Sequence, residues 1–138
     1  MTQFVRNTSQ QGLKTPEHAG GQINSPGLIM PLSRRPEPFD HPEWIFELEY
    51  GGFRSLVVIQ NGCTELISRN GNSFKSFETL RKQLKSPYQG KTVLDGEIVC
   101  LEKRGKPQLR DLLFHRDEPC FFAFDVLMSD GKDLRSKD

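Results

Sequence analysis

The stretch WIFELEYGGFRSLVVIQ, residues 44–60, contains the pattern that decides the fold. Its first half alternates apolar side chains with residues that include Glu47 and Glu49, so one row faces a core and both glutamates lie on the opposite face. Gly51 and Gly52 interrupt this pattern, and the second half is an apolar run rich in β-branched residues. We therefore expect two antiparallel strands joined as a β-hairpin.

The rest of the sequence predicts more strands and two short helices. Asn-Gly pairs at 61–62 and 70–71 indicate turns, Ser76 is available as a helix N-cap, and KRGK at 103–106 is a further turn. The fold class we expect is α+β, with antiparallel sheets and few short helices. The expected strands cover residues 64–69, 91–102 and 120–128, and the expected helices cover residues 76–84 and 109–115.

Composition divides the chain into a tail and a domain. Residues 1–26 are rich in Gln, Asn, Ser and Gly and have few large apolar side chains, so we expect a flexible N-terminal tail. Residues 27–138 are enough for one domain. The domain begins with GLIMPLSRRPEPFDHPEW, whose four prolines favour an extended segment laid on a domain surface, or a plain linker.

Charge and hydropathy exclude some classes of partner. Nineteen Lys and Arg against eighteen Asp and Glu give a net charge of +1, so a nucleic-acid partner would have to meet a local patch. No apolar run approaches the roughly 20 residues of a membrane helix, and the N-terminus lacks a signal pattern, so we expect a cytoplasmic protein with no membrane partner. The three cysteines and three histidines form no zinc pattern, which favours buried thiols in a reducing compartment.

Charged residues within the predicted strands are the candidate chemistry. A carboxylate in a buried strand is costly unless it is paired, bound to metal or functional. Arg54 and Arg69 lie beside glycine-bearing turns and offer planar donors suited to phosphate, while Phe124 could stack on a base. The residues favour a nucleotide cleft or a set of structural ion pairs. The carboxylates in question are Glu47, Glu49, Asp95, Glu97 and Asp125.

Four blocks of sequence carry a resemblance to a known family. They are PFDHPEWIFELEYGGFRSL, SRNGNSFKSF, VLDGEIVCLEKRGKPQL and FFAFDVLMSDGKDLR. In this order and at this spacing they resemble the ATP-dependent DNA ligases, most closely the ligase module of bacterial end-joining enzymes. The resemblance covers about residue 28 to the C-terminus. It implies a partial DNA ligase-type nucleotidyltransferase (adenylation) domain, ATP-grasp-like in fold, and a link to DNA repair and recombination.

The first block departs from the family pattern at its reactive position. That pattern reads E-x-K-x-D-G-x-R, and its lysine attacks the α-phosphate of ATP to form a covalent lysyl-AMP. Here Glu49 takes the place of the lysine and Gly51 that of the aspartate, whereas Glu47, Gly52 and Arg54 match. Glutamate cannot form the phosphoramidate, and its charge would repel a triphosphate by about 4 kcal/mol per unit charge at 4 Å in an effective dielectric of 20. We therefore predict no intact catalytic residue and no adenylation.

The resemblance also assigns roles to retained residues. It implies ATP and Mg²⁺ as cofactors, with Arg54 and Arg69 facing phosphates or ribose, Glu97 accepting from ribose or helping to hold metal, and Phe124 stacking on adenine. The alternative is that this chain binds no cofactor: Arg54 then pairs with Glu47 or Glu49, Glu97 pairs with Arg69, and Phe124 is ordinary core. The nucleotide-binding residues implied are Glu47, Arg54, Arg69, Glu97 and Phe124.

Three functional hypotheses follow. The family pattern continues with a later acidic block, a strand with two lysines and an OB-fold domain, so we expect a truncated, catalytically inactive ligase-like domain, with nicked or broken DNA as the family's partner. The alternative is a non-enzymatic adaptor that binds nucleotide or DNA ends, or that forms a homodimer. A third reading takes Glu47 and Glu49 as an acid/base pair of the glycosidase kind, because strand neighbours lie roughly 6.5–7 Å apart.

Overall fold

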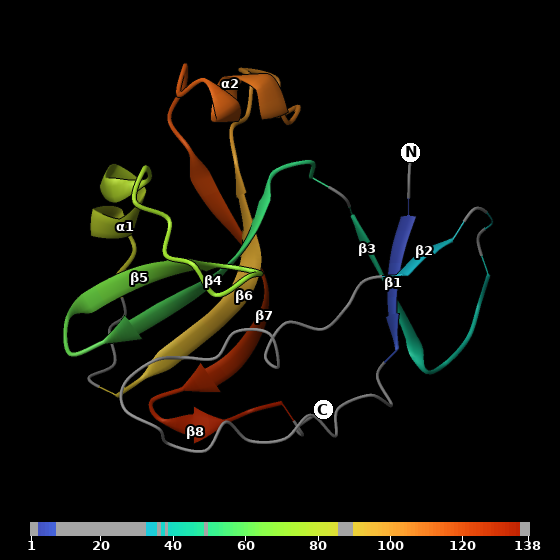
Figure 1. Ribbon diagram of the computed structural model, residues 1–138. Helices are drawn as coiled ribbons and strands as arrows, with labels where there is room; N and C mark the ends of the chain where they lie inside the picture. The colour runs from blue at the N-terminus through green and yellow to red at the C-terminus, as the bar shows by residue number, and fades with distance from the viewer. Residues whose placement is uncertain are drawn as a thin grey trace.

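The computed structural model describes residues 3–7, 33–35, 37, 39–48, 50–85 and 90–135, and within them the chain forms two antiparallel sheets (Figure 1). The smaller sheet has the strand order β2-β1-β3 and lies to one side of the larger, whose order is β5-β4-β6-β7-β8. The predicted α+β class is confirmed. The elements are β1 (Gln3–Asn7), β2 (Ser33–Arg35), β3 (Trp44–Leu48), β4 (Phe53–Gln60), β5 (Cys63–Ser68), α1 (Glu78–Gln83), β6 (Thr92–Val99), α2 (Leu109–Leu113), β7 (Cys120–Ser129) and β8 (Lys132–Asp133).

The hairpin predicted within residues 44–60 is wrong, although both of its strands form. β3 pairs with β1, from Gln3 opposite Leu48 to Asn7 opposite Trp44. β4 has β5 on one side and β6 on the other. Because both of its edges are taken, β4 has no edge left for β3.

The first strand lies in the segment expected to be a flexible tail. Gln3–Asn7 is the central strand of the smaller sheet, between β2 and β3. The segment includes Phe4 and Val5, residue types that favour strands. Residues 8–26 lie outside the described part of the chain, so the boundary of the tail stays a prediction.

The hairpin between β4 and β5 confirms the turn predicted from Asn61 and Gly62. Gln60 lies opposite Cys63, and the two residues between them have positive φ angles of 51° and 75°. Positive φ at both central positions is what a two-residue turn of the I′ kind requires, and Asn-Gly supplies it at low cost. The second Asn-Gly pair also turns the chain, with Gly71 at φ 84°.

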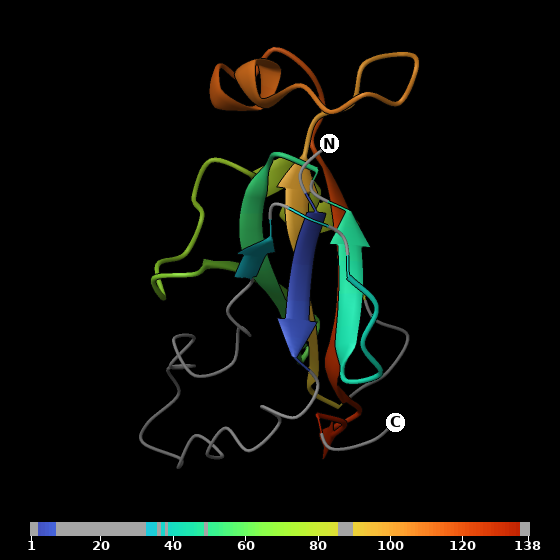
Figure 2. The ribbon, with the colours of Figure 1, turned by 90° about the vertical axis from the view of Figure 1, so that its right-hand side faces the viewer.

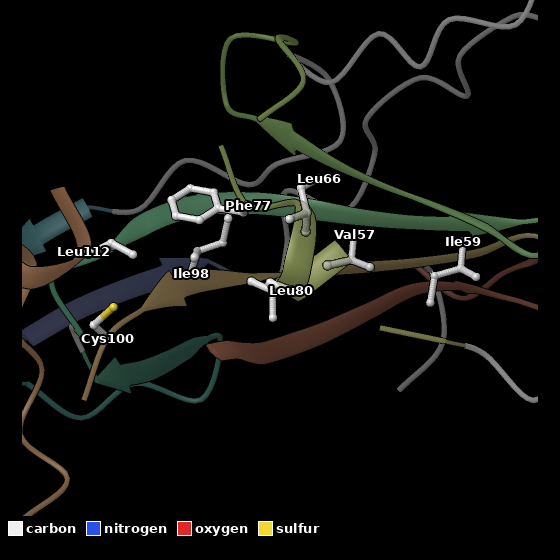
Figure 3. Close-up of a cluster of buried hydrophobic side chains, with 8 residues drawn as sticks. All are labelled: Val57, Ile59, Leu66, Phe77, Leu80, Ile98, Cys100 and Leu112. Carbon is white, nitrogen blue, oxygen red and sulfur yellow. The ribbon is translucent and has the colours of Figure 1, made fainter. Parts of the chain in front are cut away.

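Strand β4, inside the larger sheet, is buried on both faces, and its consecutive residues point to opposite sides. Val57 and Ile59 belong to a cluster on the face that α1 and α2 cover (Figure 3). Leu56 and Val58 belong to a second cluster on the other face, with Ile67, Val93 and Leu127. This explains why residues 56–59 form a continuous apolar run rather than an alternating one. The cluster in Figure 3 comprises Val57, Ile59, Leu66, Phe77, Leu80, Ile98, Cys100 and Leu112.

Both predicted helices form, but the predicted N-cap of the first helix is wrong. α1 begins at Glu78, and its N-cap is Phe77 with no side-chain hydrogen bond, so the prediction of Ser76 as the cap is wrong. Phe77 is buried in the core cluster together with Leu80, and this packing fixes the start of the helix. Leu112 is the buried residue of α2.

Candidate functional site

Gly52, at the junction of β3 and β4, is held against strand β6. Its N–H donates to Oε1 of Glu97 at 2.5 Å. A Cβ atom at Gly52 would lie 2.1 Å from the carbonyl oxygen of Ile98, so only glycine fits there. Gly51 differs, because a Cβ would meet no atom within 4 Å, but its φ of +64° also favours glycine. Glycine is therefore favoured at the two positions for different reasons: close contact with Ile98 at Gly52, and a positive φ angle at Gly51.

Arg54 makes a bidentate ion pair with Asp95 on β6. Its Nε donates to Oδ1 and its Nη2 to Oδ2, both at 2.7 Å. Arg54 lies opposite Glu97 in the strand register, so its guanidinium reaches diagonally to a carboxylate two residues away. The side chains are 14% and 2% exposed. A fork-to-fork pair with this burial is directional, and Asp95 depends on it because its carboxylate would otherwise be a buried unpaired charge.

Aromatic rings lie beside this ion pair. Tyr50 stacks on Phe122, with ring centroids 4.6 Å apart, and lies 6.2 Å from Phe124. The guanidinium carbon of Arg54 is 5.0 Å from the Phe124 centroid, within the range of a cation–π contact. Phe124 is half-buried and belongs to neither core cluster. Its ring is thus part of the site rather than of the sheet's interior.

The structure brings together three of the residues predicted for the site: Arg54, Glu97 and Phe124. Arg54 lies opposite Glu97 in the register of β4 and β6, and its guanidinium contacts the ring of Phe124. Arg69 is exposed in the turn after β5, and within the described residues no hydrogen bond or ion pair joins it to Glu97. Of the other predicted positions, Glu47 is described only as a backbone position of β3 and Glu49 lies outside the described residues.

A family model for the ATP dependent DNA ligase domain matches residues 32–138. The chain belongs to this family. Curated relatives include the multifunctional non-homologous end joining protein LigD of Pseudomonas aeruginosa, 31% identical over 124 residues that cover 85% of this chain and 15% of the relative. The multifunctional non-homologous end joining DNA repair protein LigD of Mycobacterium tuberculosis is 35% identical over 95 residues, covering 67% of this chain and 12% of that protein.

Solved structures agree with this assignment. The mycobacterial DNA ligase D complexed with ATP and MES superimposes with a TM-score of 0.56 at 31% identity, covering 63% of this chain and 30% of that one. The ligase domain of Mycobacterium tuberculosis LigD gives 0.55 with the same coverage. The predicted resemblance to the ligase module of bacterial end-joining enzymes is therefore confirmed. This ligase-family chain spans less than a fifth of the curated relatives' lengths.

The residues of this ligase-family site can supply few ligands to a metal ion. Among the described residues no group of three or more His, Cys, Asp or Glu side chains could hold one. Both oxygens of Asp95 accept from Arg54, and one oxygen of Glu97 accepts from Gly52. One carboxylate oxygen fits a Mg²⁺ ion that takes its other ligands from phosphates and water, which is how Mg²⁺ is commonly bound beside nucleotides.

The contacts of two contributors to the site are not predicted from the sequence. The sequence predicts Asp95 as a strand carboxylate but not as the partner of Arg54, and it predicts Tyr50 only as one of the alternating apolar side chains. A sequence signal exists for Asp95, because a carboxylate in an apolar strand needs a cation.

Within the described part of the ligase-family chain, no helix is long and apolar enough to cross a membrane.

Proposed function

We propose that this ligase-family domain forms no covalent adduct with AMP and serves as a non-catalytic member of the end-joining ligase group. The observation that carries the proposal is Glu49 at the position of the nucleophilic lysine. Gly51 stands in place of the aspartate, so a carboxylate of the family pattern is also missing from the same short segment. Adenylation by this family's chemistry needs an amine that attacks the α-phosphate and expels pyrophosphate. A carboxylate offers no nitrogen, and it opposes the approach of a triphosphate.

The retained residues form a frame on which a nucleotide could rest without covalent capture. Two N–H donors of Arg54 bond to Asp95, which fixes its planar guanidinium at a position where the family resemblance places phosphate or ribose oxygens. Glu97 keeps one oxygen beyond its bond to Gly52. Asp95 also offsets much of the charge of Arg54, so we propose that any binding of ATP is weak.

The test is an adenylation assay with α-labelled ATP and Mg²⁺. We expect no label on the wild-type chain after denaturing electrophoresis at neutral pH and treatment with neutral hydroxylamine. A phosphoramidate withstands alkali and neutral hydroxylamine but is cleaved by acid, whereas an acyl phosphate on a carboxylate is cleaved by hydroxylamine. The double variant Glu49→Lys/Gly51→Asp should acquire stable label if the frame is competent. Glu49→Gln is the matched control, since it removes the charge without adding an amine.

Each result of the assay has a separate meaning. A stable AMP adduct on the wild-type chain overturns the proposal of inactivity. Failure of the double variant to label, although it folds, contradicts the proposal that Arg54, Glu97 and Phe124 form a competent frame. Label on Glu49→Gln would mean that another residue is the nucleophile.

The second candidate function is non-enzymatic binding of DNA ends. Relatives named as end-joining proteins favour it, and so do the exposed cations at 103–106. A homodimer remains a prediction, and sedimentation velocity would measure the oligomeric state directly.

A further inference from the structure

Tyr50 lies in the connection between β3 and β4 and rests on two rings of β7. Its ring centroid is 4.6 Å from that of Phe122, with the planes 26° apart, and 6.2 Å from that of Phe124, with the planes 19° apart. Both pairs have the geometry of offset-stacked aromatic side chains. In Figure 2 the smaller sheet, with β1 in blue, lies in front of the larger one, and the connection that contains Tyr50 joins the two. Tyr50 therefore covers the aromatic surface of β7 from the side of the smaller sheet.

The rings of β7 share one face of the larger sheet with the charged residues of the site. Phe122 lies opposite Glu97 on β6, and Glu97 lies opposite Arg54 on β4. Residues directly opposite each other in an antiparallel pair point to the same face of the sheet. The guanidinium carbon of Arg54 is 5.0 Å from the centroid of Phe124. Phe124 thus has two planar neighbours, the guanidinium of Arg54 and the ring of Tyr50.

A planar base that stacks on Phe124 competes with these two neighbours for the area of the ring. Arg54 is fixed in place, because two hydrogen bonds of 2.7 Å hold its guanidinium on Asp95, whose side chain is 2% exposed. Tyr50 belongs to neither core cluster, and it directly precedes Gly51, where a Cβ atom would meet no atom within 4 Å. The neighbour with room to leave is therefore Tyr50.

We propose that Tyr50 is a self-inhibitory cover: its ring stands in the place of a planar base on Phe124 and has to swing away before a base stacks there. A protein that is open in only a fraction of its molecules binds a ligand more weakly by that fraction. The stacking of one aromatic pair is enough to lower the affinity about two- to tenfold. The inference rests on the nucleotide frame of the proposed function and adds to it a control of access by a residue of this chain.

The first experiment is a titration with AMP followed by the amide signals of the protein in NMR spectra. AMP has no pyrophosphate to lose, so it reports on stacking without any covalent step. We expect Tyr50→Ala to bind AMP about two- to tenfold more tightly than the wild type, because no ring has to be displaced. The matched control, Phe114→Ala, removes a ring that is 62% exposed at the end of α2 and should leave the affinity unchanged. Tyr50→Ala/Phe124→Leu should lose the gain, because the base then has no ring at position 124 on which to stack.

Movement of the Tyr50 ring is a second readout, which a merely structural role would not produce. The chain has two tyrosines, Tyr50 and Tyr88, so tyrosine labelled with ¹³C in the ring gives two sets of signals, and Tyr50→Phe assigns them. Stacking on Phe122 should place the ring protons of Tyr50 upfield of free tyrosine. Addition of AMP to the wild-type chain should move them toward the position of free tyrosine, because the ring leaves the stack.

Three outcomes would overturn the inference. The first is that Tyr50→Ala binds AMP no better than the wild type, and the second is that the gain persists in Tyr50→Ala/Phe124→Leu. The third is that AMP leaves the Tyr50 ring signals in place or moves them farther upfield, which would mean that the base stacks on Tyr50 itself. Thermal unfolding checks the fold of each variant, and the ring signals of the wild-type chain decide the question if Tyr50→Ala does not fold.

Failure of this inference and failure of the proposed function are separate results. A stable AMP adduct on the wild-type chain in the adenylation assay would overturn the proposed inactivity and would leave the predicted gain of Tyr50→Ala standing. Equal affinity of Tyr50→Ala and the wild type for AMP would overturn the cover and would leave the predicted absence of an adduct standing.

Discussion

In the segment from Glu47 to Arg54, the first half (taken as residues 47–51) and the second half (residues 52–54) differ in how they relate to the rest of the molecule. The second half is fixed to β6, through the bond from Gly52 to Glu97 and the ion pair of Arg54 with Asp95. The first half includes both departures from the family pattern, Glu49 and Gly51. Two of the retained positions, Gly52 and Arg54, hold β4 against β6, whereas the changed positions are those to which the family resemblance assigns the chemistry. Retained motif residues therefore indicate a fold more directly than an activity.

This comparison predicts that the second half is the more sensitive to substitution, and the largest effect is expected at Asp95. Asp95→Ala removes the buried carboxylate that pairs with the Arg54 guanidinium. Loss of one partner of a buried ion pair typically lowers the free energy of unfolding by about 3–5 kcal/mol. Urea unfolding followed by fluorescence of Trp44 measures the loss. Arg54→Met/Asp95→Leu should cost less than Asp95→Ala alone, since it leaves no unpaired charge. A single variant milder than the double would contradict the assigned pairing.

Gly52→Ala should have the next largest effect. The new methyl group would overlap the carbonyl oxygen of Ile98, so β4 and β6 would have to separate at the site. Overpacking of this kind costs about 1–3 kcal/mol. The same unfolding experiment measures this loss, and the amide signal of Ile98 should move in an NMR spectrum of the variant. A stability equal to the wild type would show that the junction is looser than described.

Gly51→Ala is the matched substitution in the first half and should cost about 1 kcal/mol. No atom lies within 4 Å of the added methyl group, so only the positive φ opposes it. Gly51→Asn should recover part of the loss, because asparagine tolerates this conformation better than alanine. If Gly51→Ala cost more than Gly52→Ala, the contrast between the two halves would fail.

The smallest effect is expected at an exposed ion pair that otherwise resembles the pair at the site. Arg135 also makes a bidentate contact, with Asp133, but the carboxylate is 39% exposed. Asp133→Asn should therefore cost less than about 1 kcal/mol. Hydrogen bonding to Arg135 lowers the pKa of Asp133 from 3.8 to about 2.

The pH dependence of that pair follows from the direction of the shift. Because the folded pKa lies below the unfolded one, the contribution is complete above pH 3.8 and is lost as pH falls toward 2. NMR titration of the Asp133 carboxyl carbon measures this directly. A midpoint near 3.8 would contradict the described contact.

Local signals in the sequence predicted local structure well. Asn61 and Gly62 specify their turn by their own backbone preferences, so the hairpin of β4 with β5 could be predicted without knowledge of the rest of the fold. The choice of partner for β3 could not be predicted in this way. It depends on the pairing of β5 and β6 with the two edges of β4, and the residues between 44 and 60 do not indicate which strands pair there. Ser76 failed as a cap for a similar reason, since burial of Phe77 decided where the helix begins.

The candidate site shows the same division. Arg54, Asp95 and Glu97 could each be recognised as charged residues in apolar strands. Their pairing could not be predicted, because it depends on the register of β4 against β6 and on a diagonal reach across it. The contact of Tyr50 with Phe122 joins residues far apart in sequence, and no local pattern predicts it. The family resemblance supplied roles for these positions but not their contacts.

The cysteines offer a practical route to the binding measurements. Cys63 is exposed directly after the turn that ends β4, at the opposite end of that strand from Gly52. Cys100 is buried and Cys120 is half-buried, and burial raises the pKa of both thiols. At neutral pH a maleimide dye should therefore react first with Cys63. A fluorophore could be attached to the natural sequence at one chosen point, away from the nucleotide frame and without removing any other thiol.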